Sequence, residues 1–220
     1  MNKIDRKFWR TVKQGNFLSI DHLIACGADC NVRDESGWTP LMEAVYQGRL
    51  PLVQILVNHM AEIDAQSSDG NTALMIACIT GYTDVVQYLT SVGANIGLRC
   101  QRGNTALHYA ILYRRFDIVL HLLDLGADPN CQNEEKDTPL LIAAKNRECL
   151  DNITLLIERG ANVNMVDASG STALFYLAYK GDTEVVVYLL KQGADVTLKN
   201  NRGTMPLEII QKFRPDISIF

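Results

Sequence analysis

The chain has 220 residues, 47% of them hydrophobic, and a formal net charge of −4 at pH 7. Neither half carries the basic excess that binding to duplex DNA normally requires, and no apolar run approaches the roughly twenty residues of a membrane span. The first residues, MNKIDRKFWR, are too highly charged for a secretory signal. We therefore expect a cytoplasmic or nuclear protein that binds neither nucleic acid nor membrane.

A unit of about thirty-three residues recurs along the chain. Its copies open with related phrases, which are TPLMEA from Thr39, TALMIA from Thr72, TALHYA from Thr105, TPLLIA from Thr138 and TALFYL from Thr172. A period of this length is typical of supersecondary units that stack on their neighbours. The sequence therefore predicts a stack of repeats and not a globule with a single centre.

The first copy, residues 4–34, lacks the opening phrase. Arg6 stands where the other copies have threonine, although Gly15 and Gly27 remain in register. Terminal repeats diverge in this way because their outer face meets water. We therefore expect this copy to cap the amino-terminal end of the stack.

The third copy, residues 69–101, shows how one unit folds. Thr72 is placed to cap a first helix, and apolar residues then recur at helical spacing until Gly81. A second helix follows from about Asp84, and Gly93 ends it in a left-handed cap. Two such short helices cannot bury their apolar faces alone, so stability must come from the interfaces between copies.

The period divides the whole chain, which we expect to be one domain over residues 1–220. The copies span about 4–34, 36–68, 69–101, 102–134, 135–168 and 169–201, with a partial copy over 202–220. The partial copy begins with GTMPLEIIQKF and should end its only helix before Pro215.

Three residues depart from the repeated pattern at its turns. Met60 replaces the glycine that ends the second helix elsewhere, and a side chain in that left-handed conformation costs about 1 kcal/mol. Arg114 and Arg147 replace the glycine between the two helices. These changes are drift at tolerant turns, or else Arg114, Arg115 and Arg147 form a basic patch for an acidic partner.

The repeated phrases closely resemble those of the ankyrin repeat family, over residues from about 4 to 213. The resemblance implies an all-α solenoid of stacked helix-turn-helix units joined by β-turns, with about six repeats and a C-terminal half repeat. It also implies that His108 bonds between repeats, and that Asn31, Asn130 and Asn164 are candidates for hydroxylation. Ankyrin scaffolds serve many unrelated partners, so the fold alone does not specify the function.

The search for reactive groups finds no enzyme signature. The six cysteines, which fit a reducing compartment, form no CxxC pair. His22, Cys26 and Cys30 are spaced four apart, but no fourth ligand follows at a metal-binding spacing. No glycine-rich phosphate loop or Ser, His and Asp set stands out, and His121 lies where other copies have core residues. We therefore expect no catalytic residue, no metal and no cofactor.

What remains is a surface. The resemblance implies that a protein or peptide binds the concave face, which consists of the turn tips and the exposed side of each first helix. The residues that we expect to contact it are Trp38, Tyr46, Ile79, Arg102, Leu112, Tyr113, Glu134, Glu135 and Tyr179.

Large exposed aromatic groups are common interface anchors, so Trp38, Tyr46 and Tyr113 should anchor the partner. Alternatively, these side chains pack on neighbouring tips. The acidic tip of Glu134, with Glu135 and Asp137, either sets charge complementarity or is simply solvated.

We expect a monomeric adaptor or inhibitory subunit. The alternative is a rigid obligate subunit of a larger regulatory complex, for example with a kinase or ligase, that contacts its partner through the incomplete C-terminal end. That end should leave apolar residues uncovered, and those expected at this interface are Leu207, Ile210, Phe213 and Phe220, with Ile209 beside them.

Overall fold

The computed structural model describes residues 2–146, 150–180 and 183–213. These residues form helices α1 (Lys3–Gln14), η1 (Phe17–Ser19), α2 (Ile20–Ala25), α3 (Pro40–Tyr46), α4 (Leu50–Asn58), α5 (Ala73–Thr80), α6 (Thr83–Ser91), α7 (Ala106–Leu112), α8 (Phe116–Asp124), α9 (Pro139–Lys145), α10 (Leu150–Glu158), α11 (Ala173–Lys180), α12 (Thr183–Lys191) and α13 (Pro206–Phe213). Within the described ranges there is no strand, only an isolated antiparallel bridge between Val166 and Thr172. The expectation of an all-α chain is confirmed.

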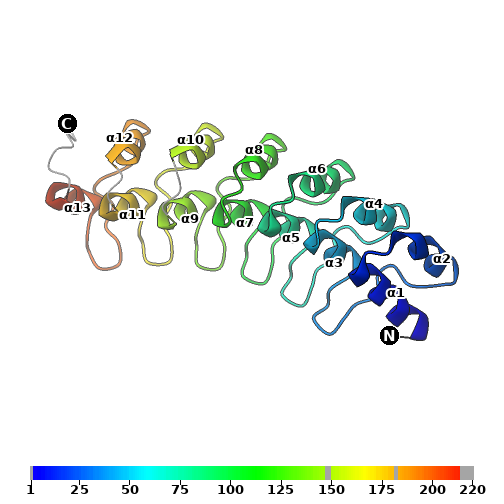
Figure 1. Ribbon diagram of the computed structural model, residues 1–220. Coiled ribbons are helices and arrows are strands. Elements are labelled where there is room, and N and C mark those ends of the chain that lie inside the picture. Colours follow the sequence, from blue (N-terminus) through cyan, green and yellow to red (C-terminus); the bar gives the residue numbers. More distant parts are fainter. Residues whose placement is uncertain (1, 147–149, 181–182, 214–220) are drawn as a thin grey trace. The chain divides into compact units, whose positions relative to one another are not determined.

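The chain divides into two compact units, residues 1–101 (unit 1) and 102–220 (unit 2). In unit 1 the first helices α1, α3 and α5 pack side by side, and α4 packs against α6 behind them. In unit 2, α7, α9, α11 and α13 form one row and α8, α10 and α12 form the other (Figure 1). Each unit is thus a two-layered stack of helix pairs.

The capping threonines start the first helices as the sequence predicts. The Oγ1 atoms of Thr39, Thr72, Thr138 and Thr172 accept the backbone N–H three residues on, at 3.2 to 3.3 Å. These bonds satisfy donors that have no partner within the helix. At the start of α7, His108 adds a second capping bond to that of Thr105, because its Nδ1 accepts the Thr105 backbone N–H at 3.1 Å.

The core repeats with the sequence. Each of the second to sixth copies buries a leucine near the start of its first helix, and these are Leu41, Leu74, Leu107, Leu140 and Leu174. Each also buries one near the end of its second helix, and these are Leu56, Leu89, Leu122, Leu156 and Leu189. Apolar burial is therefore spread along each unit, as expected for a repeat protein. None of the described helices is long and apolar enough to cross a bilayer.

Among the described residues, three that are not glycine have a left-handed backbone conformation. Met60 has φ 64° and Arg114 has φ 58°, which confirms the strain expected where they replace glycine, whereas Arg147 lies outside the described residues. The sequence reasoning missed Lys136, with φ 58°, at a turn tip where other copies have Gly37 or its equivalents. All three positions favour glycine.

The C-terminal helix is better covered than expected. Ile209 and Ile210 are 7% and 0% exposed, because α13 packs against α11. Leu207 is half-buried and Phe213 is 47% exposed, while Phe220 lies outside the described residues. The expectation of an uncovered apolar stripe is therefore wrong for Ile209 and Ile210, and it holds in full only for Phe213.

Candidate functional site

Four of the residues expected to bind a partner lie around one groove in unit 2. Arg102, Leu112, Glu134 and Glu135 line a groove of about 350 Å³. Its remaining lining residues are Asn104, Asn133, Asp137, Ile142, Lys145 and Asn146. The groove thus lies between the turn tips and the first helices α7 and α9, where the family resemblance places the binding face.

Hydrogen bonds fix the turn tip that carries the two glutamates. The Asn133 Oδ1 accepts the backbone N–H groups of Glu135 and Asp137, both at 2.9 Å. The Glu134 N–H donates to the Arg102 carbonyl of the preceding tip at 3.0 Å, and Asn133 Nδ2 donates to Asn104 Oδ1 at 2.9 Å. Two successive tips are therefore bonded to each other, and the glutamates project from a fixed backbone.

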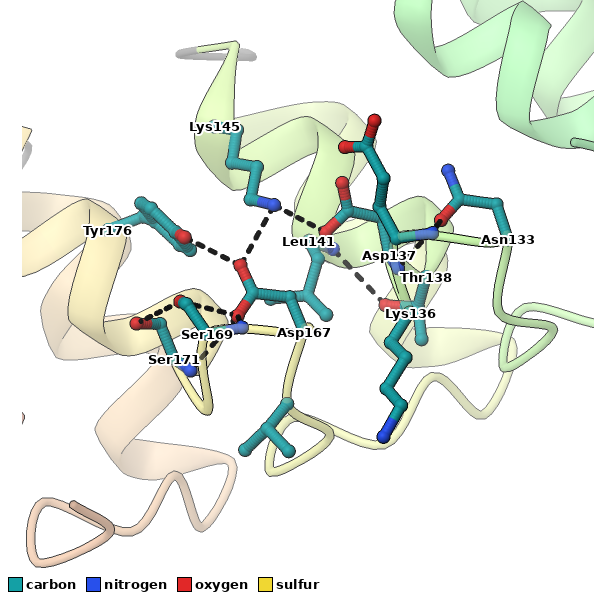
Figure 2. A network of polar contacts seen from close by, with 12 residues as sticks. Asn133, Lys136, Asp137, Thr138, Leu141, Lys145, Asp167, Ser169, Ser171 and Tyr176 are labelled. Atoms are coloured by element: carbon teal, nitrogen blue, oxygen red, sulfur yellow. Dashed lines mark hydrogen bonds and ion pairs between the residues drawn. The ribbon is translucent and has the colours of Figure 1, made fainter. Parts of the chain in front are cut away.

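Asp137 and Lys145, which line the groove, belong to a polar network that extends beyond it (Figure 2). Lys145 Nζ lies 2.5 Å from Asp137 Oδ1 and 2.8 Å from Asp167 Oδ2. The Tyr176 hydroxyl donates to Asp167 Oδ2 at 2.6 Å, and the Lys145 ammonium lies 5.2 Å from the centre of the Tyr176 ring. The Ser169 hydroxyl donates to Asp167 Oδ1 at 2.7 Å. The network joins the fifth copy to the sixth.

The ions of this network are held mainly by one another. The side chains of Asp137 and Asp167 are 7% and 3% exposed, and that of Lys145 is 28% exposed. Burial opposes the charged form of Lys145, but the hydrogen bonds and charges of both aspartates outweigh it and raise the pKa of Lys145 to about 12. The cation therefore stays charged under all physiological conditions.

The pKa values of the two aspartates are shifted in opposite directions. Burial raises the pKa of Asp137, and its hydrogen bond from Lys145 offsets this only in part. Burial also acts to raise the pKa of Asp167, but hydrogen bonds from Lys145, Tyr176 and Ser169 outweigh it and hold that pKa well below its usual range. The protein therefore stabilises the charged form of Asp167 more strongly than that of Asp137, although the Asp167 side chain is the less exposed of the two.

Asp137 is therefore not part of a solvated acidic tip. Its residue is 5% exposed and bonded to Lys145, so the exposed acidic groups of this tip are Glu134 and Glu135. One signal in the sequence could have revealed the network. Lys145 is the only cation at a position where the other copies have Tyr46, Ile79, Leu112 and Tyr179.

In unit 1 the expected anchors pack on each other. The rings of Trp38 and Tyr46 meet edge to face, with centroids 5.6 Å apart and planes at 74°. Trp38 is half-buried, Tyr46 is 56% exposed and Ile79 is half-buried. Trp38 thus has a packing role, although its ring contact is with Tyr46 of its own copy and not with a neighbouring tip, while Tyr46 presents more of its surface to solvent.

The remaining aromatic candidates belong to unit 2. Tyr113, at the end of α7, is 45% exposed. Tyr179 is 68% exposed, and its ring meets that of Phe213 edge to face at 5.9 Å between centroids. A residue predicted for the binding face and one predicted for the C-terminal end thus form a single aromatic pair.

The histidines and cysteines considered from the sequence make contacts within the repeats or between them. His108 Nε2 donates to the Asp137 carbonyl at 3.1 Å, which confirms a bond between consecutive copies. Cys26 Sγ lies 3.7 Å from His22 Nε2, whereas Cys30 is buried, and burial with the nearby Asp29 charge raises its pKa. No group of three or more potential metal ligands comes together in the described part of the chain.

Comparison with known proteins agrees with this architecture. A sequence model of ankyrin repeats, which spans three copies, matches residues 8–100, 60–133 and 122–200. The chain therefore belongs to the ankyrin repeat family, whose fold is generally a non-catalytic module for protein interactions.

Individual relatives are similar over different lengths. The crystal structure of the ankyrin repeat domain of Bcl-3, a member of the IkappaB protein family, matches with a TM-score of 0.82 and 30% identity over 92% of each chain. The rat ankyrin repeat and SAM domain-containing protein 6 is 40% identical over 82 residues, which are 37% of this chain and 9% of the relative. The alpha-latroinsectotoxin-Lt1a of Latrodectus tredecimguttatus is 36% identical over 72 residues, 33% of this chain and 5% of the toxin. The chain thus spans less than a tenth of these two relatives.

Proposed function

We propose that this chain is a non-enzymatic adaptor or inhibitory subunit, acting in the cytoplasm or nucleus, that holds a segment of a partner protein in the groove of unit 2. One observation carries the proposal. Arg102, Leu112, Glu134 and Glu135, which lie apart in the sequence, line the same groove.

The groove has the chemistry of a peptide site. Leu112 is 41% exposed and, with Ile142, offers an apolar surface for one side chain of the partner. Glu134 and Glu135 are both exposed and favour a basic residue next to it. A partner segment that places an apolar residue beside arginine or lysine fits this arrangement best.

The groove is also fixed before a partner arrives. The Asn133 bonds hold the glutamate tip, and Lys145 is held by Asp137 and Asp167. A site that is ordered in advance loses less conformational entropy on binding, which favours affinity from a small contact area. The charges of Lys145, Asp137 and Asp167 are paired with one another, so these residues hold the groove in place and do not bind the partner's charges.

Charge reversal at the glutamates tests this proposal. After affinity purification has identified the partner, Glu134→Lys/Glu135→Lys should slow its association about tenfold at low salt, because rim charges act mainly on the association rate. The matched control is Glu158→Lys/Glu184→Lys, which reverses two exposed glutamates of the second helices α10 and α12. Equal slowing in both variants would contradict binding at the groove.

A second function is favoured by the pair of Tyr179 and Phe213. Exposed aromatic side chains in contact are suited to anchor a large partner at the α11 and α13 end, as an obligate subunit of a regulatory complex would require. Phe213→Ala should then disrupt the complex in sedimentation measurements while Glu134→Lys/Glu135→Lys leaves it intact. The reverse result assigns binding to the groove.

A further inference from the structure

We propose that the exposed side of α1 binds a short acidic segment of a partner polypeptide. This basic face consists of Lys3, Arg6, Lys7, Arg10 and Lys13, all of them exposed. It lies in unit 1, so binding there does not depend on the groove of unit 2.

The helix separates its apolar and basic sides completely. Phe8, Trp9 and Val12 are buried, whereas the five cations recur at intervals of three and four residues on the opposite side. Lys3, Arg6, Lys7 and Arg10 together line a surface hollow of about 540 Å³. One anionic segment can therefore contact several of the cations at once.

No carboxylate neutralises the cations of the basic face within the described part of the chain, although Lys13 Nζ lies 5.7 Å from the centre of the Trp9 ring. Among the described residues no ion pair joins any of its five cations to a carboxylate. Asp5, the one acidic residue of the helix, is buried and accepts the Asp29 backbone N–H at 3.2 Å. Like charges three and four residues apart repel one another, and Lys3 lies at the positive end of the helix dipole. Contact with several carboxylates of a partner would offset this repulsion.

The distribution of charge selects the kind of partner. Residues 2–13 carry five cations and one carboxylate, a net +4 in a chain of net −4, so the remaining residues carry −8. The helix has 12 residues and is about 18 Å long, which matches an extended segment of about five or six residues. A short anionic segment fits this length, whereas the net charge of −8 on the remaining residues opposes a long polyanion. Phe17 and Leu18, 39% and 96% exposed, follow the helix and suit an apolar residue in the segment.

Binding of a fluorescent peptide rich in aspartate, glutamate and leucine tests the proposal by anisotropy. Replacing four cations in Lys3→Glu/Arg6→Glu/Lys7→Glu/Arg10→Glu should weaken binding about tenfold or more, and salt should weaken binding to the unaltered protein. The matched control is Lys136→Glu/Lys191→Glu/Lys199→Glu/Arg202→Glu, which changes the net charge equally at exposed sites of unit 2. The control should bind within about twofold of the unaltered protein.

Three results would overturn the proposal. They are no peptide binding by the unaltered protein at low salt, equal losses in both variants, and tighter binding to phosphatidylserine vesicles or duplex DNA than to the peptide. Circular dichroism checks that the variants fold, and glutamates near a helix start favour the helix. If the glutamate variant nevertheless unfolds, glutamine at the same four positions replaces it and should still weaken binding severalfold.

Discussion

Two regions of this protein use the same pair of repeat positions in opposite ways. The residue before the capping threonine and the seventh residue after it are Trp38 and Tyr46 in unit 1, and Asp137 and Lys145 in unit 2. The first pair meets edge to face at 5.6 Å and the second as an ion pair at 2.5 Å. The scaffold therefore fixes which positions touch, and the residues decide whether the contact is apolar or ionic.

A second carboxylate explains why an ion pair is stable at these positions in unit 2. Lys145 is also bonded to Asp167 at the end of its own copy, whereas the corresponding position after the Trp38 and Tyr46 pair is Ser67. A buried ion pair is stable only when its remaining bonding capacity is met. The second carboxylate, with its bonds from Tyr176 and Ser169, meets that requirement.

The largest effect is expected on removal of the central cation. Lys145→Met leaves two buried carboxylates without their shared cation and should lower the free energy of unfolding by about 3 kcal/mol in urea denaturation. Lys191→Met, at an exposed lysine, should change it by less than about 0.5 kcal/mol. A loss below about 1 kcal/mol for Lys145→Met would show that the network contributes little.

The same difference should depend on pH. The pKa of Lys145 is raised in the folded state, so its contribution is complete below the unfolded value of about 10.4 and is lost as pH rises through about 12. The pKa of Asp167 is lowered, so its contribution is present above about pH 4 and is lost in stronger acid. The raised pKa of Asp137 acts in the opposite direction in acid, because its folded state binds protons more readily.

Urea denaturation from pH 3 to 12 should therefore show a plateau in the stability advantage of the unaltered protein over Lys145→Met, with a decline at both ends. An advantage that does not change above pH 11 would contradict the assigned role of Lys145.

A smaller coupling is expected for the aromatic pair of unit 1. A double-mutant cycle of Trp38→Ala and Tyr46→Ala should give a coupling energy of about 1 kcal/mol, as found for edge-to-face rings. Thermal unfolding measures the coupling, and partner binding by the same variants measures their part in recognition. Lost stability with full binding would assign Trp38 to packing alone, and a coupling near zero would show that the two rings act independently.

The smallest changes concern two of the three left-handed residues, one from each unit. Met60→Gly in unit 1 and Lys136→Gly in unit 2 should each raise the free energy of unfolding by up to about 1 kcal/mol, because glycine adopts a positive φ without strain. Met60→Ala and Lys136→Ala retain a Cβ and serve as controls without gain. A gain from alanine equal to that from glycine would mean that backbone strain is not the cause.

The repeat register made much of the fold predictable. Thr72 caps its helix, Gly81 ends it with φ 88°, and Met60 and Arg114 are strained because each replaces a glycine in register. Local signals of this kind depend on the backbone conformation of a single copy, which the recurring phrases specify.

Contacts between copies were harder to predict. Lys145 bonds to Asp137 and Asp167, and Tyr176 of the next copy donates to Asp167, but the recurring phrases contain no such charges. Ile210 is buried because α13 packs against α11 through contacts that no single copy reveals. The groove likewise brings Arg102 and Glu134 together from successive tips.

The central claim is that the groove of unit 2 holds the partner, and two leucines of that unit test it most directly. Leu112 lies in the groove and is 41% exposed, whereas Leu125, at the end of α8, is 49% exposed and does not line the groove. With the partner identified by affinity purification, its dissociation constant is measured for Leu112→Ala and Leu125→Ala. We predict about tenfold weaker binding for Leu112→Ala and no change for Leu125→Ala. Truncation of an interface anchor typically costs 1 kcal/mol or more, and about 1.4 kcal/mol corresponds to a tenfold change in the dissociation constant. Equal affinities in the two variants would contradict the claim.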